Sequence, residues 1–184
     1  MTTLSACTKT LVVPVEPGRS ALVDGDHGVV FGSIVVTSNG GDPLSSSAHF
    51  VSIGWQLLNQ ETGKRFVAPK LVTRNEWYVL NLPPGKYHIT ALNYFHGFTG
   101  QWEGDVPAIF TVLPNECLYL GTWRIQLKTV GMKASAVAQV EDELAQLPKD
   151  VESIRRPCPT PPRVRLMNSS REGYLSLVQP SPGG

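Results

Sequence analysis

Short apolar segments recur along the first 127 residues of this 184-residue chain, and turn-forming residues separate them. Seven of these segments have the length and the apolar pattern of β-strands. Strands spaced about 8–12 residues apart, with Gly and Pro in the connections, are typical of a β-sandwich or barrel. We therefore expect one mainly β domain over residues 21–130. The predicted strands are residues 29–36, 51–57, 65–72, 76–82, 87–94, 107–113 and 117–127.

Two of these segments contain details that bear on the faces of the sheet. Gly32 interrupts the first segment, which indicates a bulge or a close approach of another part of the chain. In the last segment, strict alternation places Tyr119, Gly121, Trp123 and Ile125 on one face.

The charge balance argues against a nucleic-acid partner. Lys and Arg total 16 and Asp and Glu total 15, which leaves a formal net charge of +1 at pH 7. A protein that holds a phosphate backbone usually carries a large basic excess. No stretch of the sequence has the ~20 apolar residues that a membrane-spanning helix needs. We therefore expect any membrane attachment to come from a lipid anchor alone.

The residues around Cys7 resemble the lipobox of bacterial lipoproteins, in which small residues precede a cysteine that becomes acylated. Residues 4–6 are Leu-Ser-Ala. Residues 1–3 do not supply the basic and apolar regions that precede such a box, so a cysteine at an ordinary N-terminus is the alternative. The lipobox predicts a lipid on Cys7, a tether over residues 1–20 and a periplasm-facing place in the cell envelope. The alternative predicts a cytoplasmic protein.

The other two cysteines form an even pair if Cys7 carries lipid. A disulfide between Cys117 and Cys158 is chemically reasonable in an oxidising compartment. Two separate buried thiols are the alternative. No Cys-x-x-Cys motif or close Cys/His pair is present, so we expect no metal site and no cofactor.

The hydrophobic period changes after residue 130. Apolar residues three and four positions apart there are typical of one face of a helix. The spacing predicts a helix over residues 135–147, within a helical appendage of residues 131–156. Residues 157–184 are expected to form a Pro-rich tail that wraps the domain and is disordered after residue 179. The helical stripe consists of Val137, Val140, Leu144 and Leu147.

A Gly-rich segment over residues 95–106 contains several aromatic residues and is expected to be a loop. Aromatic side chains on a loop can stack on sugars or fill a pocket of a partner. They can equally fold down and cap the sandwich. The candidate binding residues are Phe95, His96, Phe98, Trp102 and Glu103.

Residues 78–89, Tyr-Val-Leu-Asn-Leu-Pro-Pro-Gly-Lys-Tyr-His-Ile, resemble the Leu-Pro-Gly-x-Tyr turn of transthyretin-like domains. These include carboxypeptidase regulatory-like modules and small bacterial lipoproteins. Residues 110–112 and 117–121 are similar to a later strand pair of such lipoproteins. The resemblance covers residues 28–147 and implies a seven-stranded Greek-key sandwich, but it implies no catalytic residues.

The sequence contains no nucleophile elbow and no phosphate-binding loop, and we expect no enzyme. The function that these patterns favour is a cell-envelope lipoprotein that binds a protein partner or acts as a scaffold. A structural subunit that uses its C-terminal tail in a larger complex is the first alternative. A carbohydrate-binding module is the second.

Overall fold

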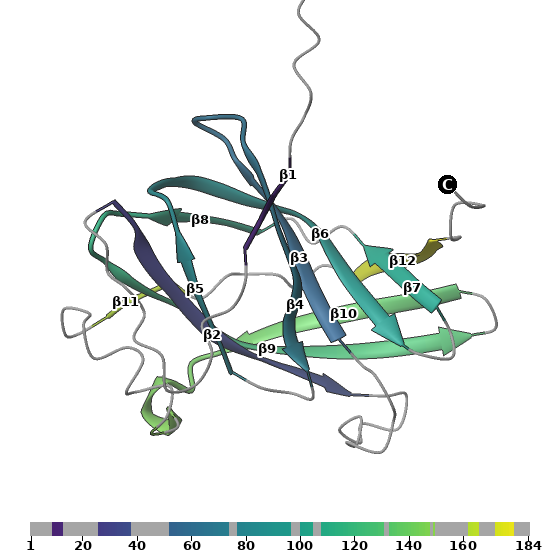
Figure 1. Ribbon diagram of the computed structural model, residues 1–184. Coiled ribbons are helices and arrows are strands. Elements are labelled where there is room, and N and C mark those ends of the chain that lie inside the picture. The colour runs from purple at the N-terminus through teal and green to yellow at the C-terminus, as the bar shows by residue number, and fades with distance from the viewer. Residues whose placement is uncertain are drawn as a thin grey trace, which may run out of the picture.

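The chain is mainly β in the computed structural model, with both parallel and antiparallel strand pairs (Figure 1). The structure describes residues 9–12, 26–37, 52–73, 77–96, 100–104, 108–130, 133–147, 149, 162–165 and 172–178. The elements are β1 (Lys9–Leu11), β2 (Gly28–Thr37), β3 (Ser52–Asn59), β4 (Arg65–Thr73), β5 (Trp77–Leu82), β6 (Gly85–His96), β7 (Gly100–Gly104), β8 (Ala108–Val112), β9 (Cys117–Val130), β10 (Lys133–Glu141), η1 (Leu144–Gln146), β11 (Arg163–Val164) and β12 (Glu172–Val178).

The seven predicted strands are confirmed as β2 to β6, β8 and β9. Period-two alternation identifies the strand at residues 52–59 correctly, because Ile53, Trp55 and Leu57 are buried there. Pro69 falls where the pairing of β3 with β4 shifts register, between the pairs Ile53–Val72 and Trp55–Ala68. A residue without an N–H fits such an irregularity.

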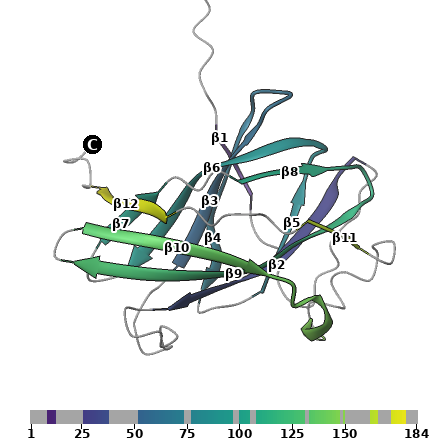
Figure 2. The ribbon, with the colours of Figure 1, turned by 180° about the vertical axis from the view of Figure 1, so that it is seen from behind.

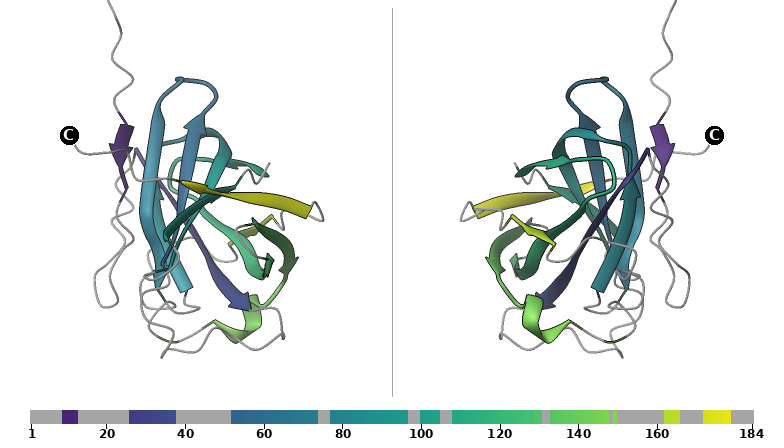
Figure 3. Two further views of the ribbon diagram at one scale, coloured as in Figure 1. Left: turned by 90° about the vertical axis from the view of Figure 1, so that its right-hand side faces the viewer. Right: turned by 90° about the vertical axis from the view of Figure 1, so that its left-hand side faces the viewer.

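Two groups of strands face each other in a sandwich-like arrangement (Figure 3). One group contains β4, β3, β6 and β8, and the other contains β5, β2, β9 and β10. Aromatic rings meet between them. The ring centroid of Trp55 on β3 lies 5.2 Å from that of Trp123 on β9 and 5.1 Å from that of Tyr78 on β5. All three side chains are buried, so the main core lies between the two groups.

The last strand, β12, connects the two groups at one side (Figure 2). It is antiparallel both to β7, where Trp102 pairs with Leu177, and to β10, where Ser135 pairs with Tyr174. The backbone groups of β7 and β10 that face β12 would be unpaired without it. The C-terminal part of the chain is therefore built into the sheet.

The predicted helix over residues 135–147 is wrong. Residues 133–141 form β10, which pairs with β9 in an unbroken antiparallel ladder from Lys133–Val130 to Glu141–Thr122. The stripe that indicated a helix covers only three turns, and tertiary pairing with a long neighbouring strand overrides such a weak local preference. A short 3-10 turn, η1, follows at Leu144–Gln146. The predicted disorder after residue 179 concerns residues outside the described ranges.

A bulge in β9 changes which side chains share a face. β2 advances from Phe31 to Ser33 while β9 advances from Tyr119 to Thr122, so β9 holds one extra residue. Gly121 has a φ of 88°, a conformation that favours glycine. The alternation therefore shifts by one at this point.

The consequence is that Tyr119 and Trp123 lie in different hydrophobic clusters, and the prediction that they share a face is wrong. Leu118 and Leu120 join Trp123 in the main core. Cys117 and Tyr119 lie on the opposite side of the sheet, in a second cluster.

The Pro-Gly-x-Tyr turn has a clear structural role. Tyr87 Oη donates a hydrogen bond to the carbonyl oxygen of Pro83, at 2.7 Å. The side chain of Asn59, at the end of β3, donates to the carbonyl oxygen of Pro84, at 3.3 Å, and accepts bonds from two N–H groups of its own turn, those of Glu61 and Thr62. Asn59 therefore joins the β3–β4 turn to the β5–β6 turn.

Gly32 provides a test of the packing between β2, β5 and β9. A Cβ at this position would lie 2.7 Å from the carbonyl oxygen of Gly121 and 2.7 Å from Tyr78 Oη. We expect Gly32→Ala to lower the free energy of unfolding by about 1–3 kcal/mol, the usual cost of overpacking a core. Urea unfolding followed by tryptophan fluorescence measures it.

Tyr78→Phe is the matched variant for this test. Tyr78 Oη is buried without a hydrogen-bond partner among the described residues, so its removal should cost little. Combined with Gly32→Ala it should restore part of the lost stability, because one of the two clashing atoms is gone. Strict additivity of the two substitutions would contradict the close contact.

Candidate protein-interaction site

A second hydrophobic cluster covers the outward face of β2, β5 and β9. We call it the outer cluster. The ring of Tyr119 lies at its centre, with its centroid 5.3 Å from that of Phe31 and 6.1 Å from that of Trp77, and Trp77 is only partly buried. The cluster consists of Val29, Phe31, Val79, Cys117 and Tyr119, with Trp77, Leu144 and Leu147 packed against it.

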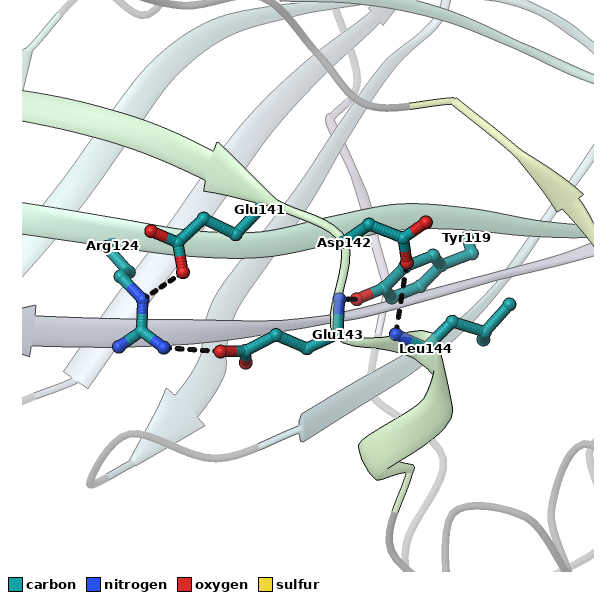
Figure 4. A network of polar contacts seen from close by, with 6 residues as sticks. All are labelled: Tyr119, Arg124, Glu141, Asp142, Glu143 and Leu144. Carbon is teal, nitrogen blue, oxygen red and sulfur yellow. Dashed lines mark hydrogen bonds and ion pairs between the residues drawn. The ribbon is translucent and has the colours of Figure 1, made fainter.

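Residues 142–147, which we call the strap, pack against this cluster through Leu144 and Leu147. Figure 4 shows the first residues of the strap beside Tyr119. The N–H of Glu143 donates to Tyr119 Oη, at 3.0 Å, and the N–H of Leu144 donates to the side chain of Asp142, at 3.1 Å. The first bond gives the buried ring a polar partner at its edge. The strap therefore covers the outer cluster by both apolar and polar contacts.

Arg124 links the end of β10 to the strap. Its Nε donates to Glu141 Oε2 at 2.6 Å, and its guanidinium also contacts Glu143 (Figure 4). The bulge at Gly121 brings this arginine to the same face as Tyr119. The hydrogen bond to Glu141 raises the pKa of Arg124. The side chains of Arg124 and Glu141 are 41% and 48% exposed, so this ion pair contributes only about 0–1 kcal/mol to stability.

The short strand β11 attaches the chain to β9 beyond the strap. This strand is parallel to β9, with Arg163 opposite Leu118, and the N–H of Arg165 donates to the carbonyl oxygen of Tyr119 at 2.9 Å. Arg163 Nε lies 2.6 Å from Glu116 Oε1, and the same guanidinium donates to the carbonyl oxygen of Thr111. The strap, β11 and β12 thus attach the C-terminal part of the chain to the sandwich at three places.

Cys117 lies in the outer cluster and is disulfide-bonded. Cys7 and Cys158 both lie outside the described residues, so the pairing with Cys158 stays a prediction. The position of β11 favours it, because Arg163 follows Cys158 by five residues and sits opposite Leu118, the residue next to Cys117.

The predicted aromatic loop is a hairpin over much of its length. Phe95 and His96 end β6, and Trp102 and Glu103 belong to β7, which pairs with β6 and β12. The prediction of a loop is wrong for residues 100–104, because they pair with β12, a strand that comes from a distant part of the chain. Phe98 lies outside the described residues, as does Cys7, and the binding role of this segment stays a prediction.

The outer cluster and the strap are absent from the sequence-based candidates. A signal for the cluster was present, because residues 29–36 are apolar at nearly every position and a strand of that kind is covered on both faces. The apolar stripe includes Leu144 and Leu147, which do pack on the sandwich, but no local pattern indicates which cluster residues 142–147 cover. Comparison with protein families, with curated proteins and with solved structures finds no match for this chain.

Three buried tyrosines should make the free energy of unfolding depend on pH in the alkaline range. Burial raises the pKa of Tyr78, Tyr87 and Tyr119 above the ordinary value of 10.0. These groups are therefore neutral in the folded chain at a pH where the unfolded chain is ionising. We expect the free energy of unfolding to be unaffected by them below pH about 10 and to fall as the pH rises above it.

Urea unfolding at a series of pH values between about 9 and 11 measures this effect. Tyr78→Phe, which removes the most buried of the three hydroxyls, should flatten the decline. A decline of the same steepness in that variant would show that Tyr78 does not contribute.

The disulfide gives a direct test by mass spectrometry of the unreduced chain. We expect a deficit of two hydrogens and a peptide that links Cys117 to Cys158. Cys158→Ser should abolish the deficit and lower the free energy of unfolding by about 2–4 kcal/mol. Cys7→Ser is the matched control and should change neither. A linked peptide that contains Cys7 would overturn the pairing.

Proposed function

We propose that this chain is a non-catalytic lipoprotein of the cell envelope that works as a binding or assembly module. The observation that supports the binding role is the return of the C-terminal part of the chain to the sandwich as added strands, while the lipid anchor rests on the residues around Cys7. β11 lies beside β9, and β12 fills the space between β7 and β10. The edges of these sheets accept extended segments, and strand addition is a common way for a binding module to take a protein partner.

Several polar side chains of the described residues are engaged in structural contacts. Arg124 and Arg163 are paired with carboxylates. The hydroxyl of Tyr87 donates to the β5–β6 turn, and the hydroxyl of Tyr119 accepts a hydrogen bond from the strap. Within the part of the chain that the structure describes, no three His, Cys, Asp or Glu side chains lie close enough to hold a metal ion. The same part contains no helix long and apolar enough to cross a membrane.

A transthyretin-like Greek-key sandwich is the fold we propose for this module. Its support is the neighbourhood of strands that are distant in the sequence. β6 lies between β3 and β8 and is antiparallel to both, although two strands separate β3 from β6 in the sequence. Greek-key paths produce such neighbours.

A structural subunit of a larger complex is the second candidate function, and β12 is the observation that favours it. A strand at the end of the chain that completes a sheet can leave its own slot and complete the sheet of a neighbour. The subunit would then be joined to its partner by the same ladder that now closes the sandwich.

Labelled palmitate tests the lipoprotein assignment in cells that express the complete gene from its natural start. We expect label on the wild-type chain, carried through an acyl group on Cys7, and none on Cys7→Ala. Cys158→Ala is the matched control and should keep the label. An unlabelled wild-type chain whose intact mass begins at Met1 would overturn the envelope location.

A further inference from the structure

Four exposed basic side chains gather at the end of the sandwich where β1 begins. We call Lys9, Lys64, Arg65 and Lys86 the basic rim. Lys9 is the first residue of β1, Lys64 ends the β3–β4 turn, Arg65 opens β4, and Lys86 is the second residue of β6. The rim is formed by three segments that are distant in the sequence, so no local charge run reveals it.

Backbone pairing places these residues together. β1 is parallel to β4, with Lys9 opposite Arg65. The N–H of Gln60, in the β3–β4 turn, donates to the carbonyl oxygen of Lys86 at 2.8 Å. The buried side chain of Asn59 holds the turn in place. Figures 1 and 3 show β1 alongside the β3–β4 hairpin.

Three members of the rim lie on the same outward face. Phe66 and Tyr87 are buried, so their neighbours Arg65 and Lys86 point away from the core, and Lys9 is the neighbour of Arg65 across the ladder. Like charges at paired positions of adjacent strands repel each other. An anion outside the protein would relieve this repulsion.

The described part of the chain does not neutralise the rim. Glu61 is the exposed carboxylate of the same turn, and no ion pair joins it to any of the four cations. The whole chain has a formal net charge of only +1, whereas the described residues of the rim and its turn carry four cations and one carboxylate, that of Glu61. Such a patch attracts a negatively charged surface.

We propose that the basic rim rests on an anionic phospholipid surface, with the β3–β4 turn facing the headgroups. The proposal rests on the proposed function in one respect, since a lipid on Cys7 would bring the membrane to this end. Lys9 follows Cys7 by two residues, a reach of about 7 Å. The Debye length is about 8–10 Å at physiological salt, so Lys9 of an anchored chain lies within the range of the surface potential.

Vesicle binding by the unacylated full-length chain tests the proposal, because the chain purified from the cytosol of an expression host carries no lipid. Its co-sedimentation is compared on vesicles of phosphatidylglycerol with phosphatidylethanolamine and on vesicles of phosphatidylcholine alone, at low and physiological salt. We expect binding to the anionic vesicles that weakens with salt. Each of Lys64→Gln, Arg65→Gln and Lys86→Gln should weaken it on the order of fivefold.

Lys149→Gln and Arg165→Gln are the matched controls, because both residues are exposed cations outside the rim. They should leave vesicle binding within about twofold of the wild type. Arg65→Gln should melt at a temperature at least as high as the wild type, because it relieves the repulsion from Lys9. That measurement separates loss of binding from loss of folding.

Equal binding to both kinds of vesicle, or equal losses in rim and control variants, would overturn the proposal. So would rim-dependent binding to an RNA oligonucleotide without binding to anionic vesicles. Rim-dependent vesicle binding together with an unacylated Cys7 in cells would leave this inference standing and remove the lipid-anchor assignment, so the two failures are distinguishable.

Discussion

Trp55 contacts Trp123 and Tyr78 across the core and so joins the two groups of strands. The other features of the structure depend on this contact. Trp55 comes from one group, and the other two rings come from the facing group. All three are fully or almost fully buried, and large aromatic rings dominate the energetics of such a core. Gly32 makes room for Tyr78 beside them, and the bulge at Gly121 turns Trp123 toward them. The same bulge brings Tyr119 and Arg124 to the opposite face, so the inner core and the outer cluster depend on one irregularity of β9.

The two ends of the chain complete the sandwich in different ways. At the N-terminal side, β1 adds three residues to the edge of β4, and Val12 continues with an N–H bond to the carbonyl oxygen of Val67. At the C-terminal side, the strap covers the outer cluster, β11 pairs with β9, and β12 closes the space between β7 and β10. Sheet edges that would otherwise expose unpaired backbone groups are covered by the chain itself. The basic rim lies at the edge of the sheet formed by β1 and β4, and the strap lies on the outward face of β2, β5 and β9.

Sequence reasoning identified the strands whose evidence is local. Residues 52–59 alternate, residues 29–36 are apolar on both faces, and the Pro-Gly-x-Tyr turn is stabilised by a bond between residues only four positions apart. It failed for β10, where alanine-rich sequence and a short apolar stripe favour a helix in isolation. It also failed for the face of Tyr119, because a single extra residue in a strand reverses the alternation beyond it. The candidate loop at residues 95–106 was assigned by composition, which carries no information about a partner strand some 70 residues later.

The sequence by itself determined a mainly β domain, the positions of seven strands and the turn around Pro84, because period-two alternation and turn chemistry act over a few residues. Only the tertiary structure decided that residues 100–104, 133–141 and 172–178 are strands, since each depends on hydrogen bonds to a neighbour. It also decided the outer cluster and the basic rim. Both bring together side chains from β-strands that are adjacent in space and distant along the chain, and that adjacency follows from sheet order, which local sequence patterns do not encode.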